Sequence, residues 1–240
     1  PGQSKMKSNR ILLFALVLAG FLLRVWYVNH GLPISFFADE TKFVYIALNT
    51  AGGYPDPDLY FSLYPYLCTL ADGIFIVLAK LFGFFKSWGE AWALYKSDPT
   101  VYYLIARLVS VFFAVLTIPL VYLIGKKMFR PAAGLLAAFF LTFSFLHVQY
   151  ASVAFRDATF VFFIMTSFLF ALRALEEGKG QDFAWTGFFG GLAFSTKWSA
   201  PPILLWGPLV LFLRAGAEKK NFFSEMFKKR NFLFFLCFTA

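Results

Sequence analysis

The sequence predicts an all-α integral membrane protein that crosses the bilayer several times. Of its 240 residues, 60% are hydrophobic and only 15% are charged, a composition too apolar for a soluble domain of this length. The apolar residues form long runs, and most Lys and Arg residues lie between these runs. A formal charge of +9 distributed in this way follows the positive-inside bias of membrane proteins, whereas a nucleic-acid partner would require one basic stripe.

The first predicted span covers residues 11–28, and three basic residues precede it: Lys5, Lys7 and Arg10. The run is long and no small-residue cleavage site follows it, so we expect a retained helix rather than a signal peptide. Its basic flank places the amino terminus in the cytoplasm. Residues 29–100 are mixed in character and contain a Gly/Pro/Asp-rich turn at 52–58, which predicts a first extracytoplasmic loop.

One segment of this loop, residues 64–85, is apolar enough to cross but contains Pro65, Asp72 and Lys80. If it does not cross, most of the 22 Lys and Arg residues share the side of the amino terminus, as the positive-inside bias expects. If it crosses, the later basic loops lie outside, and Asp39 and Asp157 lie on opposite faces. We therefore expect a juxtamembrane or re-entrant helix here.

Further spans are predicted at 102–125, 131–154, 158–172, 183–196 and 201–213, followed by an element that begins at Asn231. With the first span, these make about seven crossings, the last of them truncated. The chain begins at Pro1 and stops within an apolar run, so we expect residues 1–240 to be the amino-terminal transmembrane module of a longer protein.

Charged residues gather on the predicted outer face, where charge beside lipid is costly and indicates function. An acid at this boundary can accept the proton of a hydroxyl, and cations can stabilise a departing phosphate. Such a set suits a reaction between a hydroxyl and a lipid-carried phosphate ester. The set comprises Asp39, Glu40, Arg107, Arg156, Asp157 and Lys197.

Five short motifs occur in a recognisable order: ADETKF at 38–43, LYPYL at 63–67, ARLVS at 106–110, AFRDA at 154–158 and GGLAFSTKW at 190–198. Together they resemble the membrane glycosyltransferases of the GT-C type. The similarity is to the dolichyl-phosphate-mannose protein mannosyltransferase group and its bacterial relatives, which include aminoarabinose transferases acting on lipid A. The resemblance implies a GT-C-type bundle of membrane-spanning helices whose first extracytoplasmic loop carries juxtamembrane helices.

The resemblance also implies a reaction. A sugar would pass from a polyprenyl-phosphate-linked donor to a hydroxyl of a protein or lipid acceptor, on the extracytoplasmic face and with inversion. Asp39 would be the general base, supported by Glu40. Asp157 would orient the acceptor or, with Asp39, hold a divalent metal ion, and the resemblance leaves metal use open. The residues implied in substrate binding are Tyr64, Arg107, Arg156 and Lys197.

Each of these residues also has a simpler, non-catalytic interpretation. Asp39 and Asp157 could cap the helices that follow them, and Glu40 could be either a supporting partner in the site or a solvated surface acid. Arg107 and Lys197 could reach ordinary lipid phosphates, and Arg156 could anchor the chain at the head groups. For the whole chain, the alternative is a non-enzymatic membrane transporter or lipid-binding scaffold.

Overall fold

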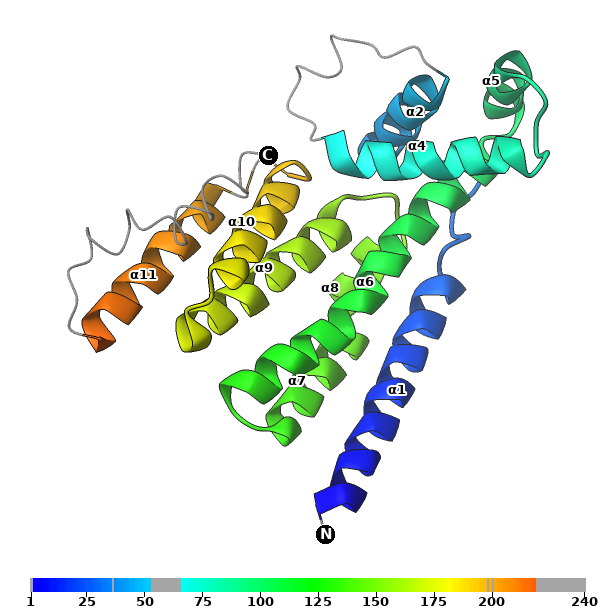
Figure 1. Ribbon diagram of the computed structural model, residues 1–240. Coiled ribbons are helices and arrows are strands. Elements are labelled where there is room, and N and C mark those ends of the chain that lie inside the picture. Colours follow the sequence, from blue (N-terminus) through cyan, green and yellow to red (C-terminus); the bar gives the residue numbers. More distant parts are fainter. Residues whose placement is uncertain (1, 36, 53–65, 198, 200, 219–240) are drawn as a thin grey trace. The chain divides into compact units, whose positions relative to one another are not determined.

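The computed structural model describes residues 2–35, 37–52, 66–197, 199 and 201–218, and every regular element among them is a helix (Figure 1). The predicted all-α membrane fold is therefore confirmed. The element expected from Asn231 and the candidate Tyr64 lie outside the described residues. The chain divides into two compact units, Pro1–Thr159 and Phe160–Ala240, each of which has its own architecture.

The first unit is built on α1 (Gly2–Trp26), α6 (Thr100–Met128) and α7 (Pro131–Phe143), and α1 packs against both of the others. Near the turn between α6 and α7, two glycines let the helix backbones approach closely. A Cβ on Gly125 would lie 2.8 Å from the Cα of Gly134, and a Cβ on Gly134 would collide with the carbonyl oxygen of Tyr122. Small residues at such points allow membrane helices to gain packing contacts.

The span predicted at 131–154 is interrupted in the structure. It consists of α7 and α8 (Phe145–Ala151), which are bent by 58° at Ser144. Ser144 has an extended backbone with ψ of 115°, so the helical ladder stops there. At the end of α7, the carbonyl oxygens of Leu141 and Thr142 accept hydrogen bonds from the buried side chain of Arg24, and the Leu141 oxygen also accepts from the N–H of Ser144.

Within the described residues, three helical segments are long and apolar enough to cross a membrane: Lys7–Trp26, Thr100–Met128 and Asp157–Glu177. The bent α7–α8 pair makes a fourth if it is counted as one span. The predicted spans at 183–196 and 201–213 correspond to shorter helices, α10 (Gly180–Phe194) and α11 (Trp206–Ala217). The total of about seven crossings stays a prediction.

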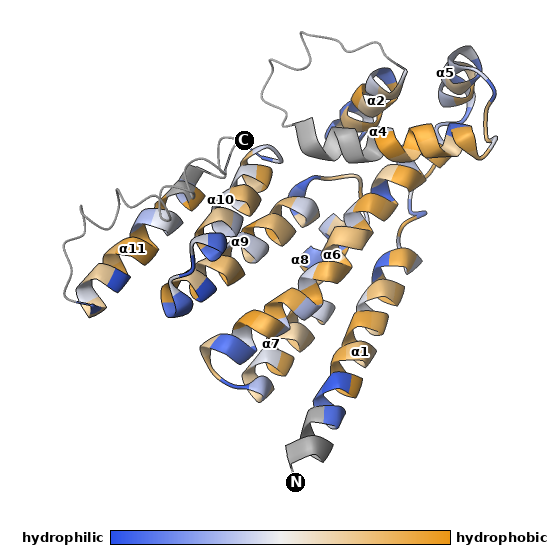
Figure 2. Ribbon diagram, in the orientation of Figure 1, coloured by the Kyte–Doolittle hydropathy of each residue, from blue (hydrophilic) through white to orange (hydrophobic). Residues whose placement is uncertain are grey.

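Three further helices gather around the amino-terminal end of α6: α2 (Ala38–Ala51), α4 (Tyr66–Leu81) and α5 (Trp88–Ser97) (Figure 1). α4 lies across this end of α6 rather than alongside it, and its 16 residues are few for a crossing (Figure 1). The polar start of α1 and the polar α6–α7 turn lie at the opposite end of the unit (Figure 2). This arrangement supports a juxtamembrane position for α4.

The second unit contains most of α9 (Asp157–Glu177), α10, a short 3-10 helix at Pro201–Leu205, and α11. Ser167 on α9 donates a hydrogen bond to the carbonyl oxygen of Thr186 on α10, and the two atoms are 2.8 Å apart. Arg173 and Asp182 add an ion pair between the same helices. The buried core of this unit comprises Ala171, Ala174, Phe183, Val210 and Leu211.

Candidate functional site

The start of α2 carries the acid pair predicted to be catalytic. The N-cap residue is Phe37, whose side chain accepts no hydrogen bond. Ser35 lies two residues before it, and its Oγ accepts a hydrogen bond from the Phe37 N–H and donates one to Glu40 Oε2 at 2.7 Å. Asp39 is therefore not the N-cap, and it lies exposed in the first turn of the helix. The two adjacent acids have different surroundings.

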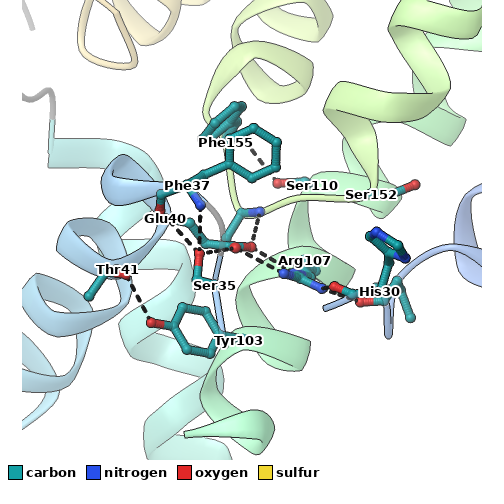
Figure 3. Close-up of polar contacts among 12 residues, drawn as sticks. His30, Ser35, Phe37, Glu40, Thr41, Tyr103, Arg107, Ser110, Ser152 and Phe155 are labelled. Carbon is teal, nitrogen blue, oxygen red and sulfur yellow. Dashed lines mark hydrogen bonds and ion pairs between the residues drawn. The ribbon is translucent and has the colours of Figure 1, made fainter. Parts of the chain in front are cut away.

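Glu40 is fully buried and accepts hydrogen bonds on both carboxylate oxygens (Figure 3). Arg107 Nε lies 2.6 Å from Oε1 and Arg107 Nη2 lies 2.9 Å from Oε2, and the N–H of Ala154 donates to Oε1 at 2.8 Å. Burial alone would raise the pKa of Glu40, but the bonds from Arg107, Ser35 and Ala154 outweigh it and hold the pKa below its ordinary value. The interpretation of Glu40 as a solvated surface acid is therefore wrong.

Arg107 on α6 is buried to the same degree, with 2% of its side chain exposed. Besides Glu40, its Nη1 donates to the carbonyl oxygens of Val28 at 2.7 Å and His30 at 2.9 Å. The guanidinium thus joins α6 to the segment after α1 and to α2. This geometry favours a positioning role for Arg107 over the phosphate-binding role that the family resemblance implies.

The connection between α8 and α9 packs against the start of α2. The rings of Phe155 and Phe37 meet edge to face with centroids 5.1 Å apart, and Ser110 on α6 donates to the Phe155 carbonyl oxygen (Figure 3). The guanidinium carbon of Arg156 lies 3.9 Å from the ring centroid of Phe43 on α2, a cation–π contact. Arg156 is thus buried against α2 rather than extended towards head groups.

Asp157 follows Arg156 directly and begins α9, where the positive end of the helix dipole favours a carboxylate. Its side chain is half-buried. Because Ala154 and Arg156 both contact α2, the turns that carry Asp39 and Asp157 belong to one contact region of the first unit. Asp39 is exposed, and its carboxylate makes no hydrogen bond or ion pair with any residue in the described part of the chain.

The remaining candidates lie elsewhere. Lys197 belongs to the second unit, where it is half-buried just beyond α10 and its N–H donates to the carbonyl oxygen of Ala193. Tyr64 lies outside the described residues. In the described ranges, no three His, Cys, Asp or Glu side chains come together as a metal site.

Arg24 is a buried charge that is not among the residues predicted for the site. Arg24 in α1 is fully buried and donates to the carbonyl oxygen of Gly20, to the end of α7, and to Nδ1 of His147 at 2.7 Å. Ser152 at the end of α8 in turn donates to the Arg24 carbonyl oxygen. A single Arg within an apolar run was the available signal, since charge at that depth is rarely without a function.

Comparison with known families assigns the chain to one of them. A sequence model of the family described as dolichyl-phosphate-mannose-protein mannosyltransferase matches residues 103–240. The chain belongs to this family. The match includes Arg107, Arg156, Asp157 and Lys197, whereas Asp39 and Glu40 precede it. No curated protein shows significant similarity to the chain.

Membership of the mannosyltransferase family implies a general activity. The family points to a glycosyltransferase that uses a polyprenyl-phosphate-linked sugar. Three apolar helices and the family both identify an integral membrane protein. In this mannosyltransferase-family protein, the ion pair of Glu40 and Arg107 holds together the region from which Asp39 and Asp157 project.

Proposed function

We propose that this mannosyltransferase-family protein transfers a sugar to a hydroxyl of a protein or lipid acceptor, on the extracytoplasmic face and with inversion, and that Asp39 is the general base. The contrast between the two adjacent acids carries the proposal. Glu40 is buried and neutralises Arg107, whereas Asp39 is exposed and has no partner among the described residues. A general base needs a carboxylate that is free to approach the substrate hydroxyl.

The proposed reaction is a single displacement. The acceptor hydroxyl oxygen attacks the anomeric carbon while the bond from that carbon to the phosphate oxygen breaks. The hydroxyl proton passes to Asp39, and the bonding electrons leave with the polyprenyl phosphate. Attack from the side opposite the leaving group inverts the anomeric configuration. A positioned general base accelerates such a step by roughly 10²–10⁴-fold.

Asp157 is the second acid in the proposal. Its turn contacts α2 through Ala154 and Arg156, which supports the proposal that Asp157 orients the acceptor hydroxyl. The carboxylates of Asp39 and Asp157 are also ligands of the kind that hard divalent cations prefer. Such an ion would supply positive charge beside the departing phosphate.

Positive charge for the leaving phosphate is assigned to Arg156, and Lys197 of the second unit is proposed as a substrate-binding residue from the family resemblance alone. Arg156 precedes Asp157 directly and is held over the ring of Phe43. Lys197 is half-buried and is the last residue but one of the GGLAFSTKW motif. Arg107 acts in this proposal through Glu40, by fixing the start of α2, and not on the phosphate itself.

The active face is proposed from the distribution of charge in the first unit. Lys126 and Lys127 lie in the last turn of α6, Arg130 follows this helix, and Lys7 and Arg10 lie in the first turns of α1. Basic residues mark the cytoplasmic side of a membrane protein. The acids at the start of α2 therefore face the opposite side.

A transfer assay with the purified protein in lipid tests the proposal. Mannose, glucose and aminoarabinose donors, each linked to polyprenyl phosphate and isotopically labelled, are supplied with a hydroxyl-bearing peptide and with lipid A as acceptors. We expect label to enter one acceptor, with the product anomer opposite to that of the donor by NMR. Retention of configuration would overturn the inverting mechanism. Absence of transfer from every donor would favour the transporter or scaffold alternative.

A further inference from the structure

A small cavity of about 150 Å³ lies beside the Glu40–Arg107 pair in the first unit. Its floor is made by Arg107, Ser152 and Val153, all nearly or fully buried. Its rim carries exposed groups that follow α1 or project from α8, among them Tyr27 and Gln149. The proposed reaction uses none of the rim residues, although the cavity adjoins the site.

The size of the cavity limits what it can hold. Cavities near this volume take up one six-membered ring, and a water molecule claims about 30 Å³ of liquid volume. The space is therefore too small for a polyprenyl chain, a disaccharide or a peptide segment. It matches one monosaccharide ring.

The charge of the floor separates a sugar from a phosphate. The guanidinium of Arg107 faces the carboxylate of Glu40 in a bidentate pair, so the floor carries no net charge. A phosphate in this position would be repelled by the negative charge of the Glu40 carboxylate, which lies next to the Arg107 guanidinium. A neutral ring with hydroxyl groups meets no such repulsion.

The polar groups of the cavity complement hydroxyls. Four of the five N–H groups of Arg107 donate to Glu40, Val28 and His30, which leaves one N–H without a partner among the described residues. The Ser152 hydroxyl already donates its hydrogen, so its oxygen can accept. The Gln149 side chain adds an amide that both donates and accepts.

The rim supplies apolar contact for the face of a ring. Tyr27 and His30 are stacked with centroids 4.8 Å apart, and Phe37 contributes a third ring. The C–H groups on one face of a pyranose suit the electron-rich face of an aromatic ring. Mostly apolar walls with a few placed polar groups are the usual composition of a ligand site.

We infer that this cavity, floored by Arg107 and Ser152 and rimmed by Tyr27, His30, Phe37 and Gln149, binds one neutral pyranose ring of a substrate. The inference rests on the proposed function, because it assigns the ring to the donor or to a saccharide acceptor of the same transferase. The cavity then selects the sugar, while Asp39 performs the proton transfer.

Binding is measured by saturation-transfer difference NMR on the protein in lipid nanodiscs. Methyl α-D-mannopyranoside and methyl α-D-glucopyranoside are the probes, and sorbitol is the control that has hydroxyls but no ring. We expect at least one pyranoside to bind and sorbitol not to bind. Gln149→Ala removes one or two hydrogen bonds and should raise the Kd about 3- to 10-fold. Gln149→Trp fills the mouth and should abolish binding.

Two variants outside the cavity are matched controls. Gln181→Ala removes an exposed glutamine of α10, and Trp26→Ala removes an aromatic side chain next to Tyr27 that is 88% exposed. Tyr27→Ala should weaken pyranoside binding, whereas both controls should leave it unchanged. If Tyr27→Ala and Trp26→Ala change pyranoside binding equally, Tyr27 is only a membrane-interface aromatic and the inference is overturned. Unchanged pyranoside binding in Gln149→Trp would also overturn it.

The transfer assay then distinguishes the source of the ring. A raised KM for the donor alone in Gln149→Ala assigns the cavity to the donor sugar, and a raised KM for the acceptor alone assigns it to an acceptor saccharide. If transfer proceeds and neither KM changes, the cavity inference fails while the proposed function stands. If pyranosides bind in the cavity but no donor is processed, the transferase proposal fails instead.

Discussion

Substitution Glu40→Gln removes the countercharge of a buried arginine. Arg107 is 2% exposed and its only carboxylate partner among the described residues is Glu40, so the variant leaves a buried positive charge without compensation. Breaking a buried pair by removing one partner costs about 3–5 kcal/mol. For a chain of this length, that loss corresponds to a drop of roughly 6–20 °C in the midpoint of thermal unfolding.

The assay is thermal unfolding of purified protein in detergent, at one protein concentration and one heating rate. Glu218→Gln is the matched control, since Glu218 pairs with Arg214 four residues earlier in a partly exposed ion pair. Pairs of that kind contribute about 0.3–0.5 kcal/mol, so the control should shift the midpoint by no more than about 2 °C. The double variant Glu40→Leu with Arg107→Met should recover part of the loss, because neither charge is left buried alone.

Equal midpoints for Glu40→Gln and Glu218→Gln would refute the reasoning. Such a result would mean that water reaches Arg107 and that the pair does not hold α2 to α6. A double variant as unstable as the sum of its single changes would refute the coupling between the two side chains.

Three other predictions follow from the fold. A cysteine at Ser87 should react with an impermeant thiol reagent added to intact cells and one at Ala132 should not; the reverse pattern would show that α4 crosses the membrane. Gly134→Val should destabilise the protein by several kcal/mol in the same unfolding assay, since the side chain would strike the backbone of α6, whereas Gly216→Val meets open space and should cost less than about 1 kcal/mol. Because the folded pKa of Glu40 lies below its ordinary value, its contribution to stability is present above about pH 4.5 and is lost as pH falls through the folded pKa. The wild-type midpoint should therefore fall below about pH 4 more steeply than that of Glu40→Gln, and parallel curves would contradict the assignment.

The helices of this protein were predictable because their signal is local. Runs of apolar residues bounded by Lys and Arg mark α1, α6 and α9, whereas Pro65, Asp72 and Lys80 predict that α4, a helix of 16 residues, does not cross. The bend at Ser144 was not predictable, because an apolar run looks the same whether it is straight or broken. At the bend, the carbonyl groups at the end of α7 accept hydrogen bonds from Arg24, more than a hundred residues earlier in the sequence, and no local pattern shows such a contact.

Which charged residues belong to the candidate site could be predicted from the sequence, but which of them pair with one another could not. Asp39, Glu40, Arg107 and Arg156 stood out as charges at a membrane boundary. Nothing local distinguishes Asp39 from Glu40, since they are adjacent acids in one helical turn. The difference comes from long-range contacts: Arg107 and Ala154 both reach Glu40 and leave Asp39 exposed.

The transfer rate of Asp39→Asn per folded molecule tests the central claim most directly. Asparagine keeps the size of the side chain but cannot accept the hydroxyl proton, and Asp39 has no hydrogen bond or ion pair among the described residues to lose. We predict a rate lower by roughly 10²–10⁴-fold, about 3–5 kcal/mol of barrier, at an unchanged unfolding midpoint. Asp98→Asn, a change at an exposed acid that accepts a hydrogen bond from the Thr100 N–H, is the control and should transfer at the wild-type rate. Near-normal transfer by Asp39→Asn would contradict the account, because the exposed acid of the pair would then not be the base.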